Sequence, residues 1–197
     1  MRDTSLSLLD RLRDEPAAPD WQRFTEIYDP VMRSWLARRG VQDQDIDDIV
    51  QNILTVVIQR MATFQHNGRV GAFRTWLRST TVNCLRDYWR TNKRRMVGAG
   101  GSDAHEWIEQ LADPDSETSR EWDEEHDRHV MRKLLELLRD EFEPRTWLAF
   151  QRFALDNVPA AEVAKELGMT PNAVWIARSR VVARLKQECA GLLEDDT

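Results

Sequence analysis

Basic and aromatic side chains gather along residues 73–95 in a pattern that suits contact with nucleic acid. Between Arg69 and Arg95, eight Lys and Arg residues stand against one acid, Asp87. Such cations neutralise phosphates, an amide can pair with a base edge, and an indole gives an unstacked base a flat surface. The segment therefore predicts contact with single-stranded or opening DNA. A solvated amphipathic helix with a half-buried tryptophan is the alternative interpretation.

At helical spacing this segment divides into two faces. The face expected to point inward carries Phe73, Leu77, Cys84 and Tyr88. The other face is predicted to meet DNA, and the side chains expected to do so are Trp76, Asn83, Arg86, Trp89, Arg90 and Arg94, with Ser79 and Lys93 beside them.

A second nucleic-acid pattern lies at residues 159–185, where the parts of a helix-turn-helix follow one another. Ala164 is small where two helices must cross, and Gly168 can take the left-handed turn between them. Thr170 can cap the next helix, which Pro171 opens. This favours a helix-turn-helix over an ordinary helical hairpin. The side chains expected to face a major groove or its phosphates are Thr170, Asn172, Trp175, Arg178, Ser179, Arg180 and Arg184.

Helical periodicity dominates the elements that must position these residues, so the predicted fold class is all-α. One helix is expected at residues 21–39, with a kink at Pro30 and a stop at Gly40. Another is expected at residues 46–61, capped by Asp43 or Asp45. Its apolar stripe is unbroken, and its outer face carries Asp48, Gln51, Asn52, Thr55 and Gln59.

Charge divides the chain into zones that predict two small helical domains. The formal net charge is −6, yet residues 96–129 alone hold eleven acids and two basic residues. We expect a helical bundle at residues 1–95, a flexible acidic linker at 96–120 and a helix-turn-helix domain at 121–197. The apolar residues Trp107, Ile108 and Leu111 interrupt the linker. They predict either a short docking helix or a chance surface cluster.

Enzymatic, metal-binding and membrane patterns are weak. Cys84 and Cys189 lie far apart, which fits a reducing cytoplasm and not a disulfide framework or a thiolate zinc site. His126 and His129 are spaced as metal ligands can be, but they stand in an acidic run and are expected at the surface. We expect no catalytic residues, no metal, no cofactor and no membrane insertion, and a soluble cytoplasmic protein.

Taken together, these motifs resemble the extracytoplasmic-function (ECF) group of bacterial RNA polymerase sigma factors, over roughly residues 21–188. The motifs that resemble sigma region 2 are Tyr28-Asp-Pro, Asp47-Asp-Ile-Val-Gln-Asn, Phe73-Arg-Thr-Trp-Leu, Val82-Asn and Arg94-Arg95. The stretch from Glu162 to Val174 resembles sigma region 4.

The resemblance implies a sigma factor that directs core RNA polymerase to promoters and opens the strands, and not an enzyme by itself. It implies that Asp48, Gln51, Asn52 and Thr55 bind the β′ clamp, with the β subunit as a further contact. Residues of the basic helix would hold the minus-ten element, and the helix after Thr170 would read the minus-thirty-five element. The resemblance also leaves room for an anti-sigma factor or another regulator as partner.

This chain departs from the family pattern at two places that bear on function. Asn52 stands where the family usually has Glu, and Trp175-Ile176-Ala177 replaces a stretch usually richer in Lys, Ser and Arg. Two other functions stay open. A stand-alone helix-turn-helix regulator would bind its operator without polymerase, and a metal-dependent hydrolase would lose function on chelation.

Overall fold

The computed structural model describes residues 7–14, 17–64, 71–91 and 101–193. Within these ranges the chain is helical and forms no β-strand, which confirms the all-α prediction. The helices are α1 (Leu8–Asp14), α2 (Ala18–Arg38), α3 (Asp43–Met61), α4 (Ala72–Thr91), α6 (Gly101–Ala112), α7 (Glu117–Arg139), α8 (Pro144–Phe150), a π-helical turn η1 (Gln151–Leu155), α9 (Ala160–Leu167) and α10 (Pro171–Cys189).

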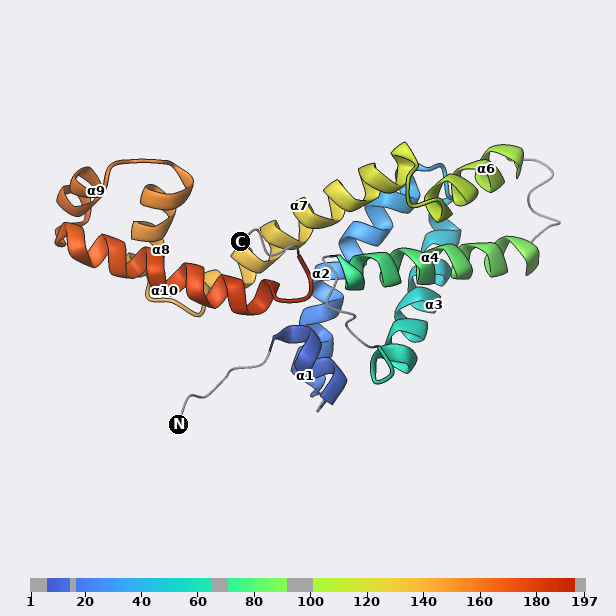
Figure 1. Ribbon diagram of the computed structural model, residues 1–197, viewed down its shortest axis with the longest axis horizontal. Helices are drawn as coiled ribbons and strands as arrows, with labels where there is room; N and C mark the ends of the chain where they lie inside the picture. Colours follow the sequence, from blue (N-terminus) through green and yellow to red (C-terminus); the bar gives the residue numbers. More distant parts are fainter. Residues whose placement is uncertain (1–6, 15–16, 65–70, 92–100, 194–197) are drawn as a thin grey trace.

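The molecule is elongated and has two lobes (Figure 1). Helices α1 to α4 and α6 form the larger lobe, and α8, η1, α9 and α10 form the smaller one. Helix α7 runs along the larger lobe, packing on α2 and α6, and its far end reaches α10. Both candidate DNA-binding helices, α4 and α10, are thus attached to one continuous scaffold.

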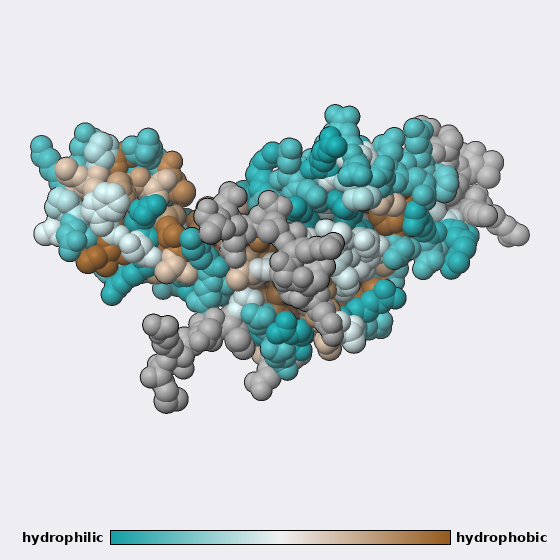
Figure 2. All heavy atoms as spheres, in the orientation of Figure 1, coloured by the Kyte–Doolittle hydropathy of each residue, from teal (hydrophilic) through white to brown (hydrophobic). Residues whose placement is uncertain are grey.

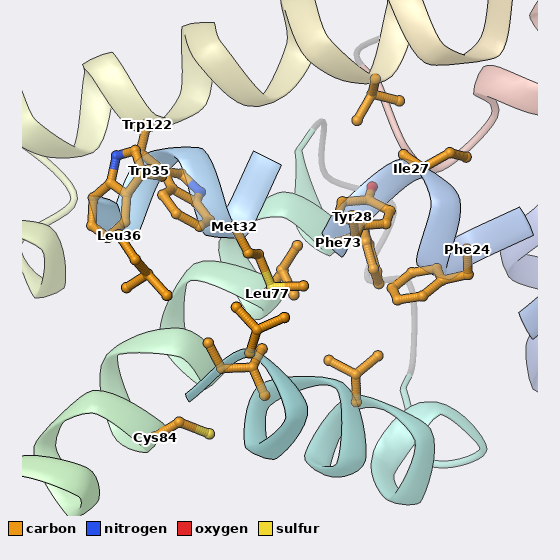
Figure 3. Packing of buried hydrophobic residues seen from close by; sticks show 14 of the residues in the cluster. Phe24, Ile27, Tyr28, Met32, Trp35, Leu36, Phe73, Leu77, Cys84 and Trp122 are labelled. Carbon is orange, nitrogen blue, oxygen red and sulfur yellow. The ribbon is translucent and has the colours of Figure 1, made fainter. Parts of the chain in front are cut away.

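Aromatic side chains fill the core of the larger lobe (Figure 3). Phe24 and Tyr28 of α2 stack with ring centroids 4.5 Å apart, and Tyr28 meets Phe73 of α4 edge to face at 5.8 Å. All three rings are almost fully buried. Such pairs add to the stability that burial of apolar area provides, so α2 and α4 are held firmly against each other.

The helices expected from the sequence form, although some of their ends differ. Pro30 lies inside α2, and Gly40 follows its end with a φ of +77°, a conformation that favours glycine. Helix α3 begins earlier than expected, with Gln42 at the N-cap position and no side-chain cap. The predicted capping by Asp43 or Asp45 is therefore wrong, because both residues lie within the first turn.

The flexible linker predicted at residues 96–120 differs most from the structure, since residues 101–112 are helical and the next helix begins at Glu117. Trp107 packs edge to face on Trp35 of α2 at 4.9 Å, and Ile108 and Leu111 are fully buried. The docking-helix alternative is thus the one observed. Ser116 caps α7 by accepting a hydrogen bond from the backbone N–H of Ser119. Helix α7 therefore connects the two lobes, although residue 121, near its start, was the expected beginning of the second domain.

The expectation of surface histidines is wrong for His126, which is only 2% exposed. The Tyr28 hydroxyl lies 3.2 Å from its Nε2, and the Asp127 carboxylate lies 2.8 Å from its Nδ1. His129 is half-buried and donates from Nε2 to the carbonyl of Ile27 at 2.8 Å. Both histidines join α7 to α2, because each makes its bond across that contact.

Candidate nucleic-acid interface

The outward face of α4 carries most of the predicted minus-ten residues. Asn83, Arg86 and Arg90 are exposed, whereas Trp76 and Trp89 are half-buried. Arg94 lies outside the described residues. Of the expected inward stripe, Phe73, Leu77 and Cys84 are buried, whereas Tyr88 is half-buried. Burial raises the pKa of the Cys84 thiol to about 11. The predicted division of α4 into two faces is therefore observed.

Trp76 is set in an aromatic cluster that fixes its ring. Its ring centroid lies 5.1 Å from that of Phe64 and 5.5 Å from that of Phe73. Trp89 is similarly in contact with Tyr88, at 5.2 Å. These tryptophans therefore have a structural role in α4, and only their exposed edges could meet a base.

Sequence reasoning missed two arginines of α4, Arg74 and Arg78, which point toward α7 and are buried. Arg78 donates to Asp123 at 2.9 Å, and Arg74 pairs with both Asp123, at 3.3 Å, and Asp127. The signal that could have revealed them is the matching spacing of four residues between the two cations and between the two acids. These ion pairs fasten α7 onto α4.

One exposed cation of α4, Arg86, is also paired within the chain. It forms a two-pronged contact with Glu109 of α6, with Nη2 2.7 and 2.8 Å from the two carboxylate oxygens. Arg90 pairs with its own helix neighbour Asp87 at 3.0 Å and with no other acid of the described residues. The acidic segment thus covers part of the cationic face that was predicted to meet phosphates.

Burial and hydrogen bonds shift the pKa values of Asp127 and His126, which lie beside Arg74. Burial alone would raise the pKa of Asp127, but hydrogen bonds from His126 and Arg74 outweigh it and hold that pKa below its ordinary value. Burial lowers the pKa of His126, so the ring is neutral near pH 7. A neutral ring can donate from Nδ1–H to Asp127 and accept the Tyr28 hydroxyl at Nε2.

The predicted polymerase-binding face lies on α3. Asp48, Gln51, Asn52 and Thr55 are all exposed. On the opposite side, Ile49, Ile53 and Val57 are at most 1% exposed. The structure therefore places the four predicted residues together on one polar surface that the core does not need.

Helices α9 and α10 are joined by a tight turn that has the local features predicted for a helix-turn-helix. Gly168 ends α9 with a φ of +58°, and the Thr170 hydroxyl caps α10 by accepting from the backbone N–H of Ala173 at 3.2 Å. Val163, Ala164 and Val174 form the buried contact between the two helices. Each local feature expected from the sequence is thus found in its place.

The first turns of α10 carry most of the predicted minus-thirty-five residues on the surface. Thr170, Asn172, Trp175, Arg178, Ser179 and Arg180 are exposed. Within the described parts of the chain, Arg178 and Arg180 make no ion pair or side-chain hydrogen bond. These two cations are therefore available to phosphates.

Arg184 is placed differently from the others, because it belongs to an ion-pair network where the two lobes meet. It binds Glu141 at 2.8 Å and also Glu188, which is fully buried in α10. Arg11 of α1 reaches the same Glu188 at 3.3 Å, and Arg23 of α2 reaches Glu141 at 3.0 Å. Arg184 therefore joins the lobes in this structure and does not face outward with Arg178.

Neither a metal site nor a membrane span is found among the described residues. They contain no group of three or more His, Cys, Asp or Glu side chains arranged to hold a metal ion. None of the described helices is both long and apolar enough to span a membrane.

Comparison with known proteins agrees with the arrangement of α2, α3 and α4. Residues 24–95 match the family model of sigma-70 region 2. Sigma-70 region 2 takes part in binding core RNA polymerase and in promoter melting. The chain matches no curated protein and no solved structure.

Proposed function

We propose that this chain is a sigma factor of the sigma-70 family, that it belongs to the extracytoplasmic-function group and that it uses α4 and α10 to read two promoter elements. The bundle around α2, α3 and α4 would be region 2, and the lobe of α8 to α10 would be region 4. A cytoplasmic location is part of this proposal, since such a protein works where its polymerase and its DNA are. The proposal also leaves room for an anti-sigma factor or another regulator as partner.

Contact with core polymerase is assigned to the α3 face formed by Asp48, Gln51, Asn52 and Thr55. The observation that carries the proposal is their position. They form one exposed row on a helix whose other side is fully buried, so they are free to bind a partner without loss of core packing. Asn52 offers a hydrogen bond where a charged residue is usual in the family, so the partner surface needs no cation opposite it.

Strand opening is assigned to the outward face of α4, with Asn83, Arg90 and the exposed edge of Trp76. An amide can bind a displaced base, and a fixed indole can support one by stacking, since little conformational entropy is then lost. Duplex recognition is assigned to α10, whose capped first turns present polar and cationic side chains as a recognition helix does.

The experiment that tests the proposal separates folding from polymerase binding. We expect Asp48→Lys, Gln51→Ala and Asn52→Ala together to leave the thermal melt near that of the wild type, because surface changes cost little. They should abolish co-purification with core polymerase and run-off transcription. A matched surface change on α2, Glu26→Lys with Gln22→Ala, should preserve both activities.

The stand-alone regulator is the competing function, and the same reconstitution decides between them. A regulator of that kind would bind its operator equally well with and without core polymerase. If the wild-type protein neither binds core enzyme from its own host nor directs initiation at any sequence selected from a random promoter library, the proposed role is wrong. No observation favours the metal-dependent hydrolase.

A further inference from the structure

The recognition helix α10 exposes large apolar side chains where cationic or polar ones would be expected. Trp175 is 51% exposed and Ile176 is 46% exposed, and both lie in the first two turns of the helix. They are among six large hydrophobic side chains that are exposed in the described ranges. Figure 2 shows hydrophobic surface on the lobe that contains α8, α9 and α10. Trp175 and Ile176 thus lie in the turns of α10 that are proposed to contact the major groove, where an exposed apolar side chain needs a physical explanation.

The structure holds the indole of Trp175 in place. Its ring meets Phe153 of η1 edge to face, with centroids 4.6 Å apart. Phe153 itself packs against the buried cluster of the smaller lobe, which includes Val163 and Val174. A braced indole loses little conformational entropy when it binds, so it suits a contact that depends on shape. The exposed half of the ring is thus presented by the lobe and does not simply project from it.

The charges around these side chains indicate a polyanionic partner. Residues 171–182 contain two arginines, Arg178 and Arg180, and no acid. Both are exposed, and within the described residues neither has an ion-pair partner. An apolar protein groove would leave these guanidiniums beside a desolvated surface, whereas a duplex supplies phosphates on both sides of its major groove. Charge complementarity therefore favours duplex DNA.

We propose that Trp175 and Ile176 recognise the 5-methyl groups of thymines in the major groove, so that the duplex element read by α10 is thymine-containing where these side chains point. This inference rests on the proposed function of α10. The thymine methyl is the apolar group on the base edges of the major groove, whereas lysine or arginine at the same positions would select the acceptors of guanine. Replacing cation with indole thus changes which base is chosen.

The test removes the methyl groups without changing base pairing. Holoenzyme formed from core polymerase and the full chain is first used to select upstream sequences from a randomised duplex. Each thymine of the selected element is then replaced by deoxyuridine, which lacks only the methyl. We expect binding to weaken about fourfold for each contacted methyl, the effect of exposing one methyl-sized apolar group. Deoxyuridine elsewhere in the probe should have no effect.

Variants assign the effect to the two side chains. Ile176→Ser and Trp175→Ala should both bind more weakly and lose sensitivity to deoxyuridine, with Ile176→Ser as the safer variant because its side chain supports no ring. Leu148→Ala, an exposed apolar change on α8 of the same lobe, should keep full sensitivity. Arg178→Ala should weaken binding equally to thymine and deoxyuridine probes.

Three outcomes would overturn the inference, and they differ in what else they affect. A selected element whose binding ignores deoxyuridine overturns methyl recognition alone. Loss of core-polymerase binding in Trp175→Ala, with unchanged sensitivity in the holoenzyme that remains, would make this a protein-docking surface instead. A wild-type holoenzyme that selects no upstream sequence overturns both this inference and the proposed role of α10.

Discussion

The two helices proposed to meet DNA differ in how their cations are held. Helix α4 has Arg74 and Arg78 buried against acids of α7, and Arg86 bound by Glu109 of α6. Helix α10 has Arg178 and Arg180 exposed and, in the described parts of the chain, unpaired. Arginine content alone therefore says little about DNA binding, because the same residue type serves as a structural tie in one helix and as a free cation in the other.

Burial separates the structural ties from the contacts that DNA could displace. The side chains of Arg74 and Arg78 are 10% and 7% exposed, so these ion pairs belong to the folded core. The Arg86–Glu109 pair is solvent-exposed on both sides and should be weak. Phosphates must therefore displace Glu109 to reach Arg86 of α4, whereas they can reach Arg178 and Arg180 of α10 without displacing another side chain.

The largest expected difference between the helices is in stability. Arg74→Ala leaves Asp127 without its arginine and Asp123 with Arg78 alone. We expect it to lower the free energy of unfolding by about 2–3 kcal/mol, less than for a fully buried pair because both acids are partly exposed. Arg178→Ala should stay within about 0.5 kcal/mol of the wild type. Urea unfolding at constant slope measures both. Equal losses would remove the distinction between tied and free arginines.

A second expected difference lies in the step of initiation that each helix serves. Asn83→Ala on α4 should make the free energy of strand opening less favourable by about 1–3 kcal/mol, the effect of losing a base contact. Arg178→Ala on α10 should weaken the upstream footprint first. Permanganate reactivity and footprinting of the same complexes report the two steps. Asn83 is a better choice than Trp76, whose packing on Phe64 and Phe73 would confuse the result. If both variants lose permanganate reactivity and the upstream footprint in the same proportion, the assignment of strand opening to α4 and duplex binding to α10 is wrong.

Acidification should loosen the larger lobe before the smaller one. The folded pKa of His126 lies below its unfolded value, so the unfolded state binds the proton more readily. The contribution of His126 to the free energy of unfolding is therefore fully present above about pH 6.5. It falls as the pH drops below that value, by up to about 1.4 kcal/mol per pH unit.

The groups that act on His126 include Tyr28, Arg74, Asp123 and Asp127, and the lowered pKa of Asp127 keeps that carboxylate charged through this range. The smaller lobe contains no histidine after residue 129. Hydrogen exchange corrected for intrinsic rates should show faster opening of α4 and α7 at pH 5.5 than at pH 7.5, with α9 and α10 unchanged. Parallel changes in all four helices would contradict this account.

The smallest expected effect concerns the exposed mask on α4. Glu109→Gln frees Arg86 and should tighten low-salt binding to a fork-junction probe by about 0.2–1 kcal/mol, the range of a surface ion pair. The gain should fade near physiological salt as charges are screened. Glu106→Gln on the same helix is the matched control, because Glu106 accepts a hydrogen bond from Gln110 and pairs with no arginine among the described residues. A similar gain from both variants would point to net charge instead of masking.

Local patterns predicted the parts of the fold that local physics decides. The apolar stripe of α3 and the Gly168–Thr170 turn could be predicted from the sequence, because each depends on neighbours within a few residues. The outward position of Asp48, Asn83 and Arg178 followed from the same periodicity.

The errors arose where distant partners decide. The segment predicted as a linker, residues 96–120, is so acidic that composition indicates a solvated stretch, yet residues 101–112 form a helix that docks through Trp107. The helix that begins at Glu117 is held by burial of Trp122 and by its ion pairs with arginines of α4. His126 could not be placed from the sequence, because its partner Tyr28 lies 98 residues away. Arg184 looked like another recognition-helix cation until Glu141 and Glu188 were found beside it.

The contact between Arg11 and Glu188 has a consequence for synthesis of the chain. Its two residues are separated by 177 positions. At roughly 5–20 residues per second, Glu188 is made about 9–35 s after Arg11. Helix α1 therefore waits while the larger lobe folds around it, and the tie to α10 can close only after the helix-turn-helix has been made. The relative orientation of the two DNA-binding helices is thus fixed late, when α10 forms its contacts with α7 and its ion pairs with Arg11 and Glu141.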